Sequence, residues 1–272
     1  MFRGRAVSLL ALATFANYAP DVARADAWPA CARTNITLAS YEATGARDGA
    51  TLRLSDGREV RLAGVIAAND LDGDQGAAVR ATAALDRLVA GKRILLYSLP
   101  DAADRHGRIL AQVALADEDG AWVQGLLVAN GMLSVGPEAG EPACTEPLIA
   151  HERAARTAKA GLWTEPRFSV ESAANLAALN GSIGRFAVVE GLVTRIGETP
   201  SRTYIDFGRR YREDFTIIIP REARAEFRAA GIDLKALRGK RIRGRGVLFS
   251  SGGPAIEVRK PASIEIIQGS GT

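Results

Sequence analysis

Apolar and polar residues alternate between residues 35 and 65, and the alternation is interrupted at Asp48-Gly49 and at Asp56-Gly57. Alternation is typical of strands with one buried face, and Asp-Gly pairs are turn signals. The pattern therefore predicts three short antiparallel strands. Two later apolar runs, at residues 92–99 and 109–116, predict two more strands.

Apolar residues at helical spacing follow in the same half of the chain and predict helices at residues 76–90, 122–130 and 145–160. Each is followed by a glycine that suits the left-handed position after a helix end: Gly91, Gly131 and Gly161. Thr145 is the expected N-cap of the third helix. Five strands with packed helices suit a barrel of the oligonucleotide/oligosaccharide-binding (OB) type.

A second β-rich pattern begins at residue 184. It predicts strands at residues 186–194, 203–207, 214–219, 238–249 and 255–267, with one helix at 221–230. A chain of 272 residues is long enough for two cores. We therefore predict a mainly β (α+β) fold of two tandem barrels, the second of them smaller and OB-like. The expected domains are residues 33–165 and 183–268, joined by a linker at 166–182.

The N-terminus has the features of a secretory signal peptide. Arg3 and Arg5 precede an apolar run at residues 6–16, and Ala23-Arg24-Ala25 is a cleavage pattern. The run is shorter than the about 20 residues of a membrane span. We expect residues 1–25 to be removed and the protein to be exported, to the periplasm or beyond, without a transmembrane segment in the mature chain. The alternative is an uncleaved membrane anchor.

The chain has two cysteines, Cys31 and Cys144. An oxidising compartment favours a disulfide between them. A loop of this length gives about 4–5 kcal/mol of stabilisation in the chain-entropy model. The alternative is a pair of free thiols.

Charge is distributed unevenly along the chain. Residues 181–272 carry 17 Lys or Arg and 10 Asp or Glu, whereas residues 26–180 carry 15 and 20. A domain that attracts a polyanion normally has the basic balance of the C-terminal part. That part is therefore the better candidate for binding nucleic acid.

Basic residues alternate along the segment 240–246, which places Arg241, Arg243 and Arg245 on one face of a strand. A loop adds Arg209, Arg210 and Tyr211. Basic residues beside aromatic ones on an OB face suit a nucleic-acid backbone and its bases, and the stacking candidates are Tyr204, Phe207 and Tyr211. The alternatives are a solvated face with Tyr204 and Phe207 in the core, and contact with an anionic membrane surface.

Residues 47–69 read Arg-Asp-Gly-Ala-Thr-Leu-Arg-Leu-Ser-Asp-Gly-Arg-Glu-Val-Arg-Leu-Ala-Gly-Val-Ile-Ala-Ala-Asn. This segment resembles the metal-site hairpin of staphylococcal-type thermonucleases, whose signature is Asp-Gly-Asp-Thr and then Arg-Leu-x-Gly-Ile-Asp-x-Pro-Glu. Three later segments resemble the same family, at residues 104–111, 122–131 and 152–163. The resemblance covers about residues 35–163, and the second half is similar to an accessory β-domain of exported members.

The resemblance implies Ca²⁺-dependent hydrolysis of phosphodiesters, in which carboxylates hold the metal and two arginines neutralise the phosphate. Three acidic positions of the family are replaced in this chain, by Ala50, Ile66 and Asn69. The two arginines remain, as Arg61 and Arg108. The resemblance therefore implies a protein without catalysis and without a cofactor.

Several alternatives stay open at this stage. Arg61 and Arg108 either hold a phosphate or pair with acids such as Asp48 and Asp104. The acids of residues 70–74 either form a displaced metal site, which would make the protein an active nuclease, or cap the following helix. A third possibility is a structural protein of the cell envelope.

Overall fold

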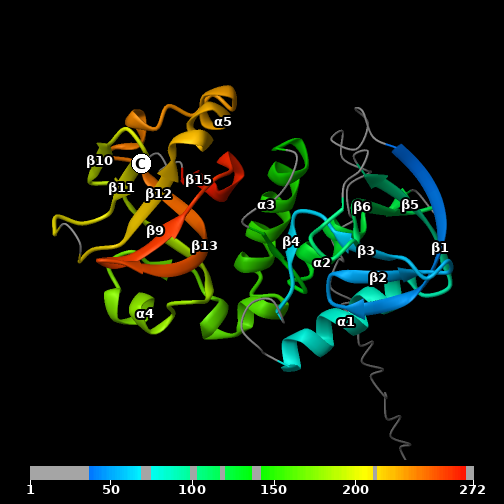
Figure 1. Cartoon of the computed structure of the whole chain (residues 1–272). Helices are drawn as coiled ribbons and strands as arrows, with labels where there is room; N and C mark the ends of the chain where they lie inside the picture. Colours follow the sequence, from blue (N-terminus) through cyan, green and yellow to red (C-terminus); the bar gives the residue numbers. More distant parts are fainter. Residues whose placement is uncertain are drawn as a thin grey trace, which may run out of the picture.

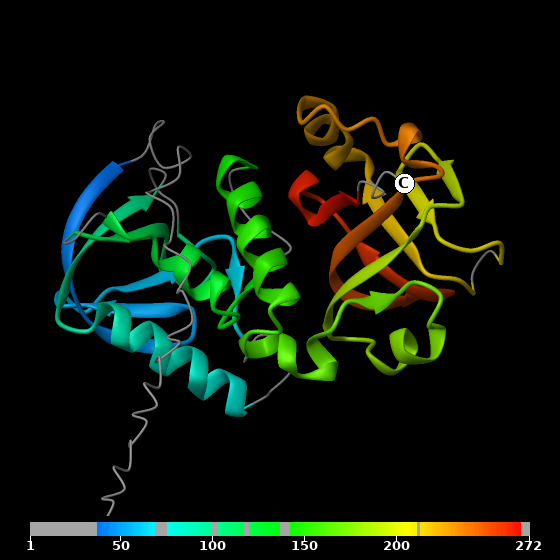
Figure 2. The same ribbon diagram turned by 180° about the vertical axis from the view of Figure 1, so that it is seen from behind.

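The computed structural model describes residues 37–68, 75–98, 103–116, 120–136, 142–210 and 213–267. Two parts lie side by side, each with its own hydrophobic core (Figures 1 and 2). We call residues 37–165 the first domain and residues 166–267 the second domain. The expected signal peptide lies outside the described residues. Among the described helices, none is long and apolar enough to cross a membrane.

The first domain contains the expected five-stranded barrel. Its strands close in the order β1-β2-β3-β6-β5, with the bounds β1 (Thr37–Asp48), β2 (Thr51–Leu54), β3 (Glu59–Leu62), β5 (Lys92–Ser98) and β6 (Ile109–Leu115). The pair β3–β6 is parallel and the other pairs are antiparallel. The expected five strands are therefore confirmed, and so is the barrel that their order together with the helices suggested.

Three helices pack on this barrel: α1 (Gln75–Val89), α2 (Val123–Ala129) and α3 (Pro142–Thr157). Gly91 and Gly131 follow the first two with φ of 69° and 64°, as expected. Thr145, however, is not the N-cap of α3. The helix begins at Pro142, whose fixed φ suits a first helical turn, and Thr145 is buried inside it.

Shorter elements complete the first domain. The strands β4 (Val65–Ile66) and β7 (Ser134–Val135) pair antiparallel, and the 3₁₀-helix η4 (Gly161–Thr164) follows α3. The sequence pattern did not predict β4 or β7, because two residues are too few to show alternation.

The second domain is a mixed sheet in the order β10-β11-β12-β14-β13-β9-β8, and β15 also pairs with β13. The bounds are β8 (Glu171–Ser172), β9 (Phe186–Leu192), β10 (Arg195–Glu198), β11 (Arg202–Asp206), β12 (Thr216–Pro220), β13 (Arg241–Ser251), β14 (Gly253–Glu257) and β15 (Ile264–Ile267).

The expected closure of a second barrel is wrong, because this sheet is open. The outer edge of β9 pairs with β8, in the register Glu171↔Val189, so it is not available to another strand there. After Leu192 the chain leaves β13: Val193 N–H still bonds Lys240 O, whereas Thr194 N–H bonds Asp206 O of β11. The two residues Val193 and Thr194 thus carry the chain from β9 to β10.

Residues 166–182, which we expected to be a linker, are folded onto the second domain. They contain η5 (Pro166–Phe168), β8 and α4 (Leu176–Gly181). Ala173 and Leu179 lie in the second core. The remaining helical elements of this domain are η6 (Arg221–Ala223), α5 (Arg224–Ala229), η7 (Lys235–Leu237) and η8 (Pro261–Ser263).

The helix α3 stands between the two sheets in both ribbon views, with the barrel on one side and the second domain on the other (Figures 1 and 2). It contacts α2 and β7 within the first domain and η8 in the second. The helix α3 is therefore one of the elements through which the domains meet.

Candidate functional site

The turn between β1 and β2 carries the first position at which the thermonuclease signature has a metal-binding aspartate. In this chain Ala50 occupies it and is closed to solvent within the first core. The turn is fixed by Asp48 Oδ1, which accepts the Ala50 N–H at 2.9 Å. Beside it Gly49 lies against α1, since a Cβ there would come within 2.7 Å of the Ala81 Cβ. The barrel thus surrounds Ala50 with packed atoms.

Ile66 occupies the second of these positions. It lies in β4 and packs against a small apolar cluster of Ala68, Ala77 and Leu162. Phe168 and Phe186 of the second domain pack against the same cluster. Ile66 therefore belongs to the packing between the domains rather than to a polar cleft.

These residues do not fit a calcium ion. Ca²⁺ takes six to eight oxygen ligands, with carboxylates prominent among them. Ala50 and Ile66 have no oxygen in their side chains. Across the described ranges, no three His, Cys, Asp or Glu side chains gather in a way that would hold a metal. The other candidates, Asn69 and the acids Asp70, Asp72 and Asp74, lie outside the described residues.

The two arginines that match the family lie beside acids. Arg108 Nε donates to Asp104 Oδ2 at 2.7 Å, and Arg108 Nη1 donates to Thr51 Oγ1 at 3.2 Å. Arg61 stands opposite Thr51 in the β2–β3 pair, with its Nη1 3.9 Å from Asp48 Oδ1. The interpretation of Arg61 and Arg108 as partners of Asp48 and Asp104 thus agrees with the geometry.

The Asp104 carboxylate organises its loop. Its Oδ1 accepts the backbone N–H of His106 at 2.8 Å and of Arg108 at 3.1 Å. Burial raises the pKa of Asp104, but the hydrogen bonds from Arg108 and His106 outweigh it, and the pKa lies below its ordinary value. The His106 side chain is exposed, and its Nε2 lies 3.1 Å from Arg105 Nε.

The basic face of β13 is not a free surface. Glu190 of β9 and Glu265 of β15 stand opposite Arg243 in the two neighbouring strands. Arg243 Nε donates to Glu190 Oε2 at 2.7 Å, and Arg241 Nη1 lies 3.4 Å from the other oxygen of the same carboxylate. Exposure falls along the face, from 56% for the Arg241 side chain through 20% for Arg243 to 1% for Arg245.

Arg245 is at the centre of a charge cluster that joins the domains. Its Nη1 donates to Glu152 Oε2 of α3 at 3.0 Å and to Val135 O at 3.2 Å, and its Nη2 donates to Glu265. Burial lowers the pKa of Arg245, but the two carboxylates outweigh it and raise the pKa above its ordinary value. The expectation that Arg245 binds a polyanion is therefore wrong, because its guanidinium is buried and its donors are engaged.

The carboxylates of this cluster are fully engaged as well. Glu152 accepts from Ser134 Oγ at 3.0 Å, from Val135 N–H at 2.6 Å and from Arg156 Nη1 at 2.7 Å. Glu265 lies 3.3 Å from Arg153 Nη2 and 3.5 Å from Arg156 Nη2. We call Glu152, Arg156, Arg243, Arg245 and Glu265 the interdomain charge cluster. The sequence analysis did not find it, because Glu152 and Arg156 of α3 are far in the chain from Arg243, Arg245 and Glu265.

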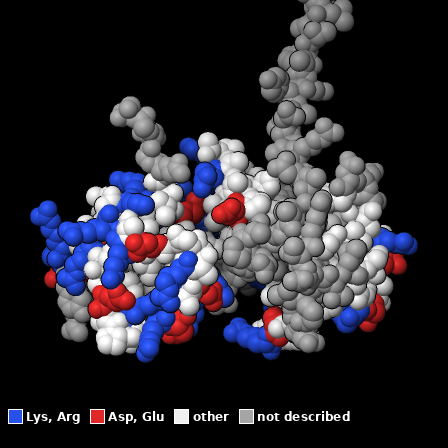
Figure 3. All heavy atoms as spheres, turned by 90° about the horizontal axis from the view of Figure 1, so that it is seen from above, with Lys and Arg blue, Asp and Glu red and all other residues white. Residues whose placement is uncertain are grey.

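The other predicted binding residues lie elsewhere in the second domain. Arg209 and Arg210 line a pocket of about 430 Å³ together with Arg195, Arg238 and the acids Asp206 and Asp214. Arg210 Nη1 pairs with Glu213 Oε2 at 3.0 Å. Tyr211 lies outside the described residues. In Figure 3, Lys and Arg side chains cover much of the visible face of the second domain, with acids between them.

The two described stacking candidates have different environments. Phe207 packs against the second core, with its ring centroid 5.1 Å from that of Phe215. Tyr204 lies on the outer face of β11, where it lines a pocket of about 470 Å³ with Arg202 and a smaller one with Arg195. The alternative of a core position thus applies to Phe207, whereas Tyr204 is accessible.

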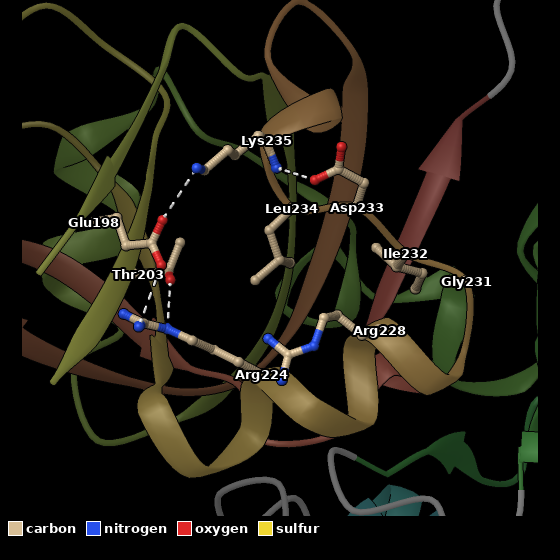
Figure 4. Close-up of a pocket in the computed structure, with 9 residues that line it drawn as sticks. All are labelled: Glu198, Thr203, Arg224, Arg228, Gly231, Ile232, Asp233, Leu234 and Lys235. Carbon is tan, nitrogen blue, oxygen red and sulfur yellow. Dashed lines mark hydrogen bonds and ion pairs between the residues drawn. The ribbon is translucent and has the colours of Figure 1, made fainter. Parts of the chain in front are cut away.

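A further pocket, of about 520 Å³, lies between the β10–β11 hairpin and the segment from α5 to η7 (Figure 4). Three basic residues line it: Arg224, Arg228 and Lys235. The sequence analysis did not single them out, because they come from two short elements without a motif.

The expected disulfide has one end in the described part of the chain. Cys144 is buried in α3, and Cys31 lies outside the described residues. The pairing of the two therefore stays a prediction.

Comparison with known proteins agrees with the geometry of the first domain. Residues 59–165 match the family model described as staphylococcal nuclease homologue. No curated protein matches the chain. The segment 59–165 is therefore a staphylococcal-nuclease-like domain, and a second β-sheet domain follows it.

Proposed function

We propose that this protein is an exported, non-hydrolytic relative of staphylococcal nuclease that binds nucleic acid or another polyanion. The observation that supports the loss of hydrolysis is the packing of Ala50 and Ile66. The first is enclosed in the barrel core, and the second is part of the apolar contact between the domains. A carboxylate at position 50 would be buried among apolar atoms, and one at position 66 would be partly buried against an apolar cluster. Burying a charge without a partner is costly.

The outer face of β10 and β11 is the best-supported binding surface. Tyr204 presents an aromatic ring there, beside Arg202 and Arg195, whose side chain is 63% exposed. Stacking of a base on an aromatic ring contributes about 1–3 kcal/mol, whatever the base. Asp206 and Asp214 line the same surface, so we expect weak binding that is sensitive to salt.

The test of hydrolysis is the release of acid-soluble nucleotides from DNA and RNA by purified protein. We expect no release with Ca²⁺, Mg²⁺ or Mn²⁺. Digestion that a chelator abolishes, and that is lost in Arg108→Ala, would establish an active nuclease instead.

The test of binding is fluorescence anisotropy of a labelled oligo-dT at low salt. We expect Tyr204→Ala to weaken binding about tenfold, in line with the loss of one stacked base. Arg241→Ala tests the other candidate face and should have little effect, because Arg241 is paired with Glu190. Absence of affinity for single-stranded DNA, RNA and heparin, together with capture of one stoichiometric envelope protein, would favour a structural role.

Export has its own test, because it predicts that Cys31 and Cys144 are joined. Peptide mapping of non-reduced protein from the periplasm should find the cross-linked pair and an N-terminus near residue 26. Two free thiols in that material would contradict the proposal of export.

A further inference from the structure

The pocket beside the β10–β11 hairpin is not lined by Tyr204, although Glu198 of the hairpin borders both this pocket and the Tyr204 surface. Thr203 lines the pocket, and neighbouring residues of a strand point to opposite faces. One wall of the pocket is charged, with Glu198, Arg224 and Arg228 (Figure 4). The lining also contains the apolar side chains of Ile232 and Leu234, which pack against the second core as well. The pocket therefore combines fixed charges with an apolar surface.

Arg224 is held rigidly by its neighbours. Its Nε donates to Thr203 Oγ1 at 3.0 Å and its Nη2 to Thr199 O at 2.7 Å, and its Nη1 lies 3.2 Å from Glu198 Oε1. The side chain is only 15% exposed. Arg224 thus lines the pocket and neutralises Glu198. Its donors are largely engaged by these partners, so few remain for a ligand.

Arg228 is different. It lies one turn after Arg224 on α5, so the two side chains share a face of the helix. It is exposed, and its guanidinium makes no ion pair or side-chain hydrogen bond with any residue in the described part of the chain. In Figure 4 this guanidinium is turned into the space between Arg224 and Leu234. A guanidinium offers two parallel donors that match the two oxygens of a carboxylate.

The charges around the pocket favour a ligand with a single negative charge. Three basic residues and two acids line it, which leaves one positive charge. Lys235 Nζ lies 3.7 Å from Glu198 Oε2, and Asp233 Oδ1 accepts the Lys235 N–H at 3.0 Å. Both Glu198 and Asp233 would repel the several negative charges of a polyphosphate. A single carboxylate bound to Arg228 carries one negative charge and would be repelled less.

We propose that this pocket binds an organic monocarboxylate with a compact branched apolar group. The carboxylate pairs with Arg228, and the apolar group lies against Ile232 and Leu234. A small free acid and the C-terminal residue of a peptide share this chemistry. The site does not include Tyr204, Arg202 or Arg195 of the polyanion surface, although Glu198 borders both.

Titration calorimetry and two-dimensional NMR of the purified protein test the proposal, with isovalerate as the probe. We expect saturable binding of isovalerate. Isovaleramide, which lacks the carboxylate, and acetate, which lacks the branched apolar group, should each bind at least about tenfold more weakly. Arg228→Gln should weaken isovalerate binding about tenfold. Arg221→Gln, at an exposed arginine of η6 outside the pocket, should leave it unchanged.

A peptide that ends in leucine distinguishes the two sources of the ligand. Tighter binding of the peptide than of isovalerate, lost when its C-terminus is amidated, identifies a chain terminus. Binding of isovalerate at least as tight as that of the peptide identifies a free acid. The proposal is overturned if neither carboxylate gives saturable binding, if isovaleramide binds as well as isovalerate, or if Arg228→Gln binds like the wild type.

Discussion

Arg245 Nη1 donates to both carboxylate oxygens of Glu152, at 3.0 and 3.2 Å, across the boundary between the domains. The two side chains are 1% and 0% exposed. Buried charges are tolerated when each has partners for its donors and acceptors, as these have. The interdomain charge cluster therefore couples the stability of one domain to the presence of the other.

Replacement of Arg245 by methionine should destabilise the whole chain. Glu152 and Glu265 would stay buried with one fewer cation between them, and breaking a buried pair costs about 3–5 kcal/mol. Urea unfolding, followed by circular dichroism, measures the loss. Arg241→Met is the matched control, because Arg241 lies on the same face of the same strand but is 56% exposed. A loss of stability equal to that of this control would contradict the prediction.

The Glu265 carboxylate should make stability depend on pH. Burial raises the pKa of Glu265, but Arg245, Arg156 and Arg243 outweigh it, and the pKa lies below its ordinary value of 4.5. A group with a lower pKa in the folded chain stabilises the fold above its unfolded pKa, and this stabilisation is lost as the pH falls through the folded pKa.

Glu265→Gln should therefore be less stable than the wild type at neutral pH, and the difference in the free energy of unfolding should shrink below pH 4.5. Urea titrations at a series of pH values measure that difference. Glu213→Gln is a suitable control, because the Glu213 side chain is 59% exposed. A difference that stays constant from neutral to acid pH would speak against the assigned role of Glu265.

Restoring an aspartate at position 50 should not restore a metal site. Ala50→Asp would place a carboxylate among core side chains, and we expect a loss of about 2 kcal/mol or more in the free energy of unfolding. Thermal unfolding with and without Ca²⁺ measures both effects. Ala83→Asp, on the exposed face of α1, should cost far less. Marked stabilisation of Ala50→Asp by Ca²⁺ would show that a metal fits after all.

Substitutions at two glycines distinguish the effect of backbone strain on stability from that of close packing. Gly91 and Gly161 both have positive φ, 69° and 53°. A Cβ at Gly91 would meet no atom within 4 Å, whereas one at Gly161 would lie 2.3 Å from Gly131 O. We expect Gly91→Ala to cost about 1–2 kcal/mol from strain alone, and Gly161→Ala to cost clearly more. Equal melting temperatures for the two variants would refute the difference.

Local patterns predicted most elements of the fold. The expected helix at 76–90 is α1 at Gln75–Val89, and the expected strand at 92–99 is β5 at Lys92–Ser98. Such elements follow from the spacing of apolar residues, which is a property of neighbours in the chain. The open second sheet did not follow from it, because β9 pairs with β8, a two-residue strand that is too short to show a pattern.

The candidate site was predicted less well, for a related reason. Alternation placed Arg241, Arg243 and Arg245 on one face correctly, but it does not say what covers that face. The answer depends on Glu152 and Glu265, which come from other elements. Likewise the family resemblance identified Ile66 as the replacement of an acidic residue. Its packing against Ala68, Ala77 and Leu162 is visible only in the structure.

The separation of Glu152 from Arg245 along the chain has a consequence for biosynthesis. The two residues are 93 positions apart, and the acid is made first. Until the ribosome has completed β13, Glu152 has Ser134, Val135 and Arg156 as partners but lacks the Arg245 guanidinium. The interdomain charge cluster is therefore assembled in full only late in translation, after β13 and β15 have been synthesised.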